Sequence, residues 1–229
     1  MMQGFCLLIV NFRGSIGYGE DSLNTLLGTI GENDVADCGN LTKKALELFP
    51  NIIDPERLGV FGGSHGGFLT GHMIGHPEFK DMFKAASLWN PVLDMTYMVN
   101  STDIPDWIFA CCGNEEIDFG TLTVEQKVNF YNRSPMAHVR NVVTPAQFII
   151  GDHDLRVPPH QAYYYEAALK SRGIETRLYN YPGSGHLLLP VEHGMDATFN
   201  ISHWMDKFLI APFEPPFEEQ SSTEQSPEE

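Results

Sequence analysis

The sequence predicts an α/β fold, in which a mostly parallel β-sheet carries helices on both faces. Apolar, β-branched runs alternate with longer helix-like stretches, the pattern of parallel strands joined by crossover helices. Hydrophobic residues make up 42% of the 229 residues, which is enough for a sizeable core. A cluster of glycines around Ser64 marks an abrupt change from an apolar run to a helix-like stretch. No internal repeat interrupts this pattern.

The predicted strands are the short apolar runs, and the predicted helices are the longer periodic stretches between or after them. Pro77 and Gly173 are natural stops for two of the helices. Residues 93–144 are less regular, and we expect them to form a lid or part of a pocket. The expected strands are residues 5–12, 57–63, 83–92, 145–152 and 176–182, and the expected helices are 32–49, 67–77, 159–173 and 198–210.

The formal charge of −16 argues against nucleic acid as a partner. The opening apolar run lacks a basic region before it and is too short to span a bilayer, so neither a signal peptide nor a membrane anchor is expected. Residues 212–229 are rich in Pro, Ser and Glu and are predicted to be an acidic disordered tail, or else a docking peptide. Residues 1–211 then form one domain. Cys6, Cys38, Cys111 and Cys112 are expected to be reduced, small apolar residues of a cytoplasmic protein.

Two residue pairs consist of possible metal ligands, but neither is accompanied by the further ligands that a metal site needs. His72 and His76 lie four residues apart on a predicted helix, and Cys111 directly precedes Cys112. We expect the histidines on an ordinary helix surface, and we expect neither a metal nor a cofactor.

The pattern Gly62-x-Ser64-x-Gly66 lies between a predicted strand and a predicted helix. Glycine is costly to order, so its repetition here indicates a tight turn or a close approach of backbones. A serine so placed is the nucleophile elbow of α/β-hydrolases, with small residues on either side that let strand and helix pass closely. Backbone strain of about 1–3 kcal/mol at the serine is tolerated because it lifts the hydroxyl above the sheet edge.

A serine hydroxyl needs a base to take its proton, and in this fold the acid and the base follow later in the chain. The strand that ends at residue 152 offers Asp154, with Asp152 as the alternative. His186 follows the last predicted strand and a Gly-Ser-Gly turn, and His153 is the weaker candidate for the base. In this scheme Ser64 attacks an acyl carbon while His186 shuttles the proton and Asp154 fixes the imidazole.

Several segments in order resemble the catalytic domain of the prolyl oligopeptidase family, from about residue 5 to residue 210. They are NFRGSIGYG, RLGVFGGSHGGFLT, NPV, STDIPDW, SPMAHV, TPAQFIIGDHDLRVPPHQAYYYEAALKSRG and YPGSGH. Within the family, STDIPDW and the histidine after the serine resemble the peptidases that remove an N-acylated residue from blocked peptides. Such peptidases are cytosolic and need no metal. The resemblance therefore implies a serine peptidase acting on N-acylated peptides, with a homo-oligomer left open.

The resemblance also implies a role for individual residues. It puts the nucleophile on Ser64, the acid on Asp154 and the base on His186. It assigns Arg156 to a substrate carbonyl and Trp107 to a pocket wall, although an ion pair and a core tryptophan are the alternatives. The backbone N–H of His65, the residue after the serine, is expected to be one oxyanion donor.

The chain departs from the family at its beginning. The family places a propeller and the first hydrolase strands before this point, including a loop that gives the second oxyanion N–H. A strand would normally separate 5–12 from 57–63, so these two are expected to flank a gap or to pair directly. We therefore expect a fragment, a truncated product or one chain of a complex. The alternatives for function are a small-ester hydrolase of the same fold and a non-catalytic, hydrolase-like module.

Overall fold

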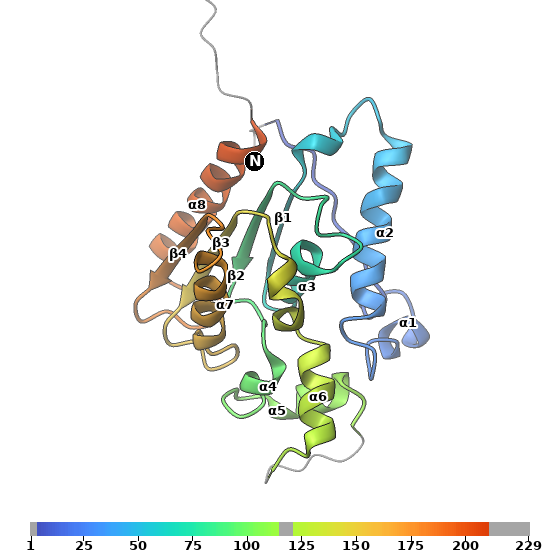
Figure 1. The fold of residues 1–229 in the computed structure, drawn as a ribbon, viewed down its shortest axis with the longest axis vertical. Helices are drawn as coiled ribbons and strands as arrows, with labels where there is room; N and C mark the ends of the chain where they lie inside the picture. The colour runs from blue at the N-terminus through green and yellow to red at the C-terminus, as the bar shows by residue number, and fades with distance from the viewer. Residues whose placement is uncertain (1–3, 115–120, 211–229) are drawn as a thin grey trace, which may run out of the picture.

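A four-stranded parallel sheet forms the centre of the computed structural model, which describes residues 4–114 and 121–210. The expected α/β architecture, with a parallel sheet and crossover helices, is confirmed (Figure 1). The strands lie side by side in chain order, and the pairing puts Val60 opposite Ala86 and Ile149 opposite Tyr179. The strands are β1 (Gly59–Gly63), β2 (Ala85–Trp89), β3 (Ala146–Gly151) and β4 (Thr176–Tyr181).

Helices cover both faces of the sheet because successive side chains of a strand point to opposite faces. On β3, Phe148 and Ile150 join the larger core under α3 (His65–Gly75) and α7 (His160–Lys170). Ile149 joins the smaller core under α8 (Val191–Leu209). Figure 1 shows α8 on one side of the sheet and α3 on the other. Every residue of β3 is buried, so this strand is central.

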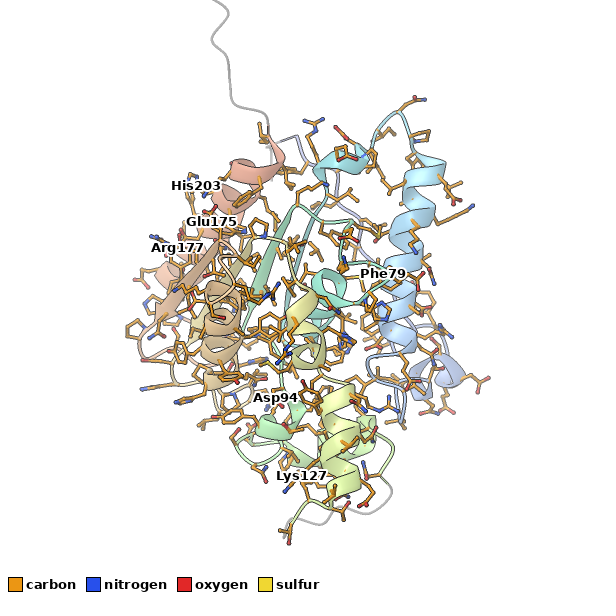
Figure 2. The ribbon with its side chains drawn as sticks, in the orientation of Figure 1. Phe79, Asp94, Lys127, Glu175, Arg177 and His203 are labelled. Carbon is orange, nitrogen blue, oxygen red and sulfur yellow. The ribbon has the colours of Figure 1, made fainter. Side chains whose placement is uncertain are left out.

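The helix α2 (Asn33–Leu48) forms an outer layer over α3. A Cβ at Gly39 of α2 would lie 2.3 Å from the ring of Phe79, so only glycine allows this close packing. Lys43, one turn further along α2, lies 4.7 Å from the centroid of the same ring. Figure 2 labels Phe79 on the side of the molecule where α2 and α3 meet.

Short helices occupy the predicted lid region and gather at one end of the sheet (Figure 1). The helix α4 (Met95–Met98) begins after Asp94, whose carboxylate accepts hydrogen bonds from the backbone N–H groups of Thr96 and Tyr97. Asp94 and Lys127 are labelled in this part of Figure 2. The remaining elements are α1 (Glu20–Asn24), η1 (Pro55–Arg57), α4 (Met95–Met98), α5 (Pro105–Cys111), α6 (Val124–Asn132) and η2 (Pro135–Asn141).

The expectation of a strand over residues 5–12 is wrong. The segment has no regular structure, and in Figure 1 it runs from the end near α8 towards α1. The side chains of Leu7, Leu8 and Ile9 are 55%, 49% and 81% exposed. A strand exists only when a neighbour accepts and donates its backbone hydrogen bonds, and within the described residues β1 pairs only with β2. The segment is apolar enough for a strand but has no partner.

Four of the expected strands and all four expected helices are present, with bounds that differ by a few residues. The largest difference is α8, which begins at Val191 rather than at residue 198. The predicted tail, residues 212–229, lies outside the described residues. Among the described helices, none combines the length and the apolar character needed to cross a bilayer.

His72 is not on a helix surface as expected, because its side chain is only 1% exposed. Its Nε2–H donates to the carbonyl oxygen of Arg133 at 3.0 Å, and burial lowers its pKa to about 3. The cysteines are free thiols, and burial raises the pKa of Cys111 and Cys112 to about 12. Cys6 is exposed, whereas Cys111 and Cys112 are buried.

Candidate active site

Ser64 lies in the sharp turn between β1 and α3. Its backbone has φ 57° and ψ −119°, a strained conformation for a residue with a side chain. Its N–H donates to the carbonyl of Trp89 at 2.9 Å, which fastens the turn to the end of β2. A Cβ at Gly62 would lie 2.3 Å from the carbonyl oxygen of Gly66, whereas a Cβ at Gly66 would meet nothing within 4 Å. Of the two glycines that flank Ser64 in the motif, the close passage of strand and helix therefore requires only Gly62.

The structure brings together His186 and Asp154, one from each of the two loops expected to supply them. His186 Nδ1–H donates to Asp154 Oδ2 at 2.7 Å. The other carboxylate oxygen accepts the backbone N–H groups of Arg156 and Val157, both at 2.9 Å. Asp154 is 3% exposed, so its charge is held by these three donors rather than by water. With Nδ1 protonated, Nε2 of His186 is the nitrogen left to take a proton.

The two alternative residues have other contacts. Asp152 Oδ1 accepts the backbone N–H of Gly183 at 2.7 Å, and so it supports the loop rather than the imidazole. His153 has an exposed side chain, and its N–H donates to the carbonyl of Ser184 at 2.9 Å. Within residues 4–114 and 121–210, Ser64 Oγ forms no hydrogen bond.

Sequence reasoning missed a second aspartate–histidine pair beside the serine. His65 Nε2 lies 3.0 Å from Oδ2 of Asp34, which is fully buried in the first turn of α2. The His65 ring packs between the rings of Phe12 and Phe68, at centroid distances of 5.2 and 5.3 Å. The backbone N–H of His65 lies in the first turn of α3, where a helix offers no acceptor, so it can point at a ligand.

Arg156 is held by Asp103, which belongs to the STDIPDW segment. Its Nε and Nη2 donate to the two carboxylate oxygens of Asp103 at 2.7 and 3.2 Å. The Arg156 guanidinium holds the pKa of that carboxyl below its ordinary value. Thr102 Oγ1 also donates to the carbonyl of Arg156 at 2.7 Å, and the N–H of Asp103 donates to the carbonyl of Leu155 at 3.0 Å, so the two loops are joined by backbone and side-chain bonds. Arg156 is thus a half-exposed cation fixed next to the loop of Asp154.

Trp107 is half-buried and packs against the larger core. Its ring meets the ring of His65 edge-on, with 6.3 Å between the centroids. Trp107, His65 and Phe12 therefore form an aromatic group next to Ser64. By contrast, Arg13 forms an ion pair with Asp37 of α2 and fixes the segment that carries Phe12.

Among the described residues, no three His, Cys, Asp or Glu side chains lie together as a group that could hold a metal ion.

Known proteins with similar sequences and known proteins with similar structures carry names of the same kind of peptidase. The chain is 41% identical over 206 residues to the acylamino-acid-releasing enzyme of Arabidopsis thaliana, covering 90% of this chain and 26% of the relative. It is 35% identical over 207 residues to the enzyme of that name from Homo sapiens, covering 90% of this chain and 28% of the relative. The structure of the Pyrococcus horikoshii acylaminoacyl peptidase matches with a TM-score of 0.78 and 26% identity, covering 91% of this chain and 33% of that one.

The chain thus spans 26% to 28% of the length of these two relatives. A model of the prolyl oligopeptidase family matches residues 1–210, which include every residue that the structure describes. The fold, the strained serine and the sequence match agree, and the chain belongs to the prolyl oligopeptidase family.

Proposed function

We propose that this chain carries the catalytic centre of a serine peptidase that releases an N-acylated residue from the N-terminus of blocked peptides. The observation that carries the proposal is the 2.7 Å hydrogen bond between His186 and Asp154, formed at the sheet edge where β1 presents the strained Ser64. The names of the relatives support the same reaction. One structural relative is an acylaminoacyl peptidase in complex with Z-Gly-Gly-Phe-chloromethyl ketone.

The proposed reaction proceeds through an acyl-enzyme. His186 Nε2 accepts the proton of the Ser64 hydroxyl as the oxygen attacks the carbonyl carbon of the acylated residue. Asp154 keeps the proton on Nδ1 and stabilises the imidazolium that forms. The backbone N–H of His65 donates to the developing oxyanion. His186 then returns the proton to the leaving amine, and water hydrolyses the ester of Ser64 by the same route.

The position of Arg156 favours a peptide over a simple ester as the substrate. Asp103 engages Nε and Nη2, and within the described residues Nη1 makes no hydrogen bond, so it is available to a substrate carbonyl. A guanidinium fixed by a carboxylate is a good anchor because little side-chain freedom is lost when it binds. Trp107 and His65 offer an apolar wall for the acyl group or the side chain of the acylated residue.

A fluorophosphonate probe tests the nucleophile, because it forms an adduct only with an activated serine. Mass spectrometry should map the adduct to Ser64, and Ser64→Ala and His186→Ala should abolish it. His153→Ala is the matched control and should keep most of the labelling. An adduct on another serine, or undiminished labelling of Ser64→Ala, would contradict the proposal.

The second candidate is a small-ester hydrolase that uses the same three residues. The half-exposed side chain of Arg156 favours this second candidate. A cation that is open to water adds less binding free energy for a peptide carbonyl than a buried one, so the preference for peptides over esters is weaker.

The free thiols of all four cysteines support a reducing compartment such as the cytoplasm as the place of action.

A further inference from the structure

Asn90 follows the last residue of β2 and lies where the loops of Ser64, Asp154 and His186 meet. Its side chain is 2% exposed. Nδ2 donates to the carbonyl oxygen of His186 at 2.7 Å, and Oδ1 accepts the backbone N–H of Gly151 at 2.9 Å. One amide therefore joins the end of β2 to the end of β3 and to the histidine loop.

The backbone around Asn90 is fastened to the serine turn. The residue before it, Trp89, accepts the N–H of Ser64 at 2.9 Å, and Val92 donates to the carbonyl of Ser64 at 3.4 Å. The N–H of Asn90 itself donates to Ile149 of β3 at 2.7 Å. Segment 89–92 thus holds Ser64 by its backbone while the side chain of Asn90 holds the other two loops.

The residue type matches both demands of the position. Asn90 has φ 39°, a region that asparagine, aspartate and glycine adopt more readily than other residues. The amide orientation follows from its partners, because a carbonyl can only accept and a backbone N–H can only donate. Asparagine is the residue that tolerates this backbone and offers one donor and one acceptor at this length. Aspartate would lose the donor, and glycine would lose both groups.

We propose that Asn90 is the positioning residue of the active site, which sets the position of His186 relative to Ser64 through the carbonyl of His186. It touches no substrate and acts through the histidine loop. The inference rests on the proposed function, since the positioned groups are the proposed nucleophile and base. A displacement of about 1 Å in such groups reduces turnover by roughly 10²-fold, so loss of the Nδ2 bond should be visible in the rate.

Two substitutions separate the hydrogen bonds from the strained backbone. Asn90→Gly accepts the positive φ and removes both bonds, whereas Asn90→Asp keeps an acceptor for Gly151 and removes the donor to His186. Each should lower the rate of fluorophosphonate labelling of Ser64, per folded molecule, by about 10- to 100-fold. With a nitrophenyl ester, kcat should fall by a similar factor while KM stays within about twofold, because the substrate contacts are unchanged.

Asn141→Asp is the matched control. Asn141 Nδ2 donates to a backbone carbonyl, that of Gly75, at 3.1 Å, but at the far end of α3 from Ser64. The same loss of an amide donor there should leave the labelling rate per folded molecule unchanged. Folded protein is quantified by near-ultraviolet circular dichroism, so a loss of stability is not counted as a loss of rate.

Wild-type labelling rates in both Asn90 variants would overturn the inference and leave the proposed function intact. A normal rate in Asn90→Asp together with a slow Asn90→Gly would also overturn it, because the bond to Gly151 would then be the one that matters. If Asn90→Gly does not fold, the rate of Asn90→Asp decides alone. Wild-type protein that is not labelled at Ser64 would overturn both proposals.

Discussion

Gly151, the last residue of β3, gives the sharpest test of the geometry around His186. A Cβ built at this position would lie 2.4 Å from the carbonyl oxygen of Ser184 and 2.6 Å from that of Gly185. Both are backbone atoms of the loop that leads into His186, so no side chain can rotate away to make room. Ordinary Cβ contacts begin at 3.4 Å, so Gly151→Ala must push this loop outward by about 1 Å.

The strand cannot retreat instead, because every residue of β3 is buried between two neighbouring strands and two layers of helices. A shift of about 1 Å in a catalytic group corresponds to a loss of roughly 10²-fold in kcat/KM. The overpacking itself should lower the free energy of unfolding by about 1–3 kcal/mol. Turnover of a nitrophenyl ester and the thermal unfolding transition measure the two effects separately.

Gly185→Ala is the matched control in the same loop. Its Cβ would have its nearest neighbour, the carbonyl oxygen of His153, at 3.8 Å, and its φ is not in the left-handed region. Activity within about twofold of wild type is expected for this variant. Full activity in Gly151→Ala, measured per folded molecule, would show that the loop before His186 can move without displacing His186, which would contradict this prediction.

Gly62→Ala should prevent folding of the serine turn, since its Cβ would meet a backbone oxygen at 2.3 Å, whereas Gly66→Ala should leave the unfolding transition unchanged or raise it. Equal unfolding temperatures in the two variants would contradict the predicted clash at Gly62. Arg156→Ala should reduce kcat/KM for an acyl-peptide more than for a nitrophenyl ester, and Asp103→Asn should reduce it in the same direction by a smaller factor. Equal losses on both substrates would contradict an anchoring role. His72 binds its proton near pH 6.5 when unfolded but only near pH 3 in the fold. Its titration therefore leaves stability unchanged well above pH 6.5, and it lowers the free energy of unfolding by up to about 1.4 kcal/mol per pH unit as the pH falls from 6.5 towards 3. Urea unfolding at pH 7 and pH 5 should therefore show a smaller loss of stability for His72→Gln, and identical losses would refute this assignment.

The parts of the site that follow local rules were predictable from the sequence. Ser64 stands out because a strand, a glycine cluster and a helix follow one another, and His186 because it follows a strand and a small-residue turn. The choice between Asp152 and Asp154 was open in the sequence, since both follow the same strand. It is the fold that places Oδ2 of Asp154 against the imidazole.

The missed residues act through partners far along the chain. Asn90 and His186 are 96 residues apart, Asp103 and Arg156 are 53 apart, and Asp34 and His65 are 31 apart. No local pattern of apolar and polar residues contains such pairings. The wrong strand over residues 5–12 has the same cause, because strand formation depends on a neighbour as much as on composition.

The order of the strands in the sheet has a consequence for synthesis. The strands lie in the sheet in the order in which the ribosome makes them, so each can be added to the growing edge of the one before it. Ser64 follows β1 and Asp154 follows β3, but His186 comes only after β4. A nascent chain that has folded as far as β3 holds the serine and the acid without a base. On the proposed mechanism, the set of serine, acid and base would therefore be complete only when the last strand docks.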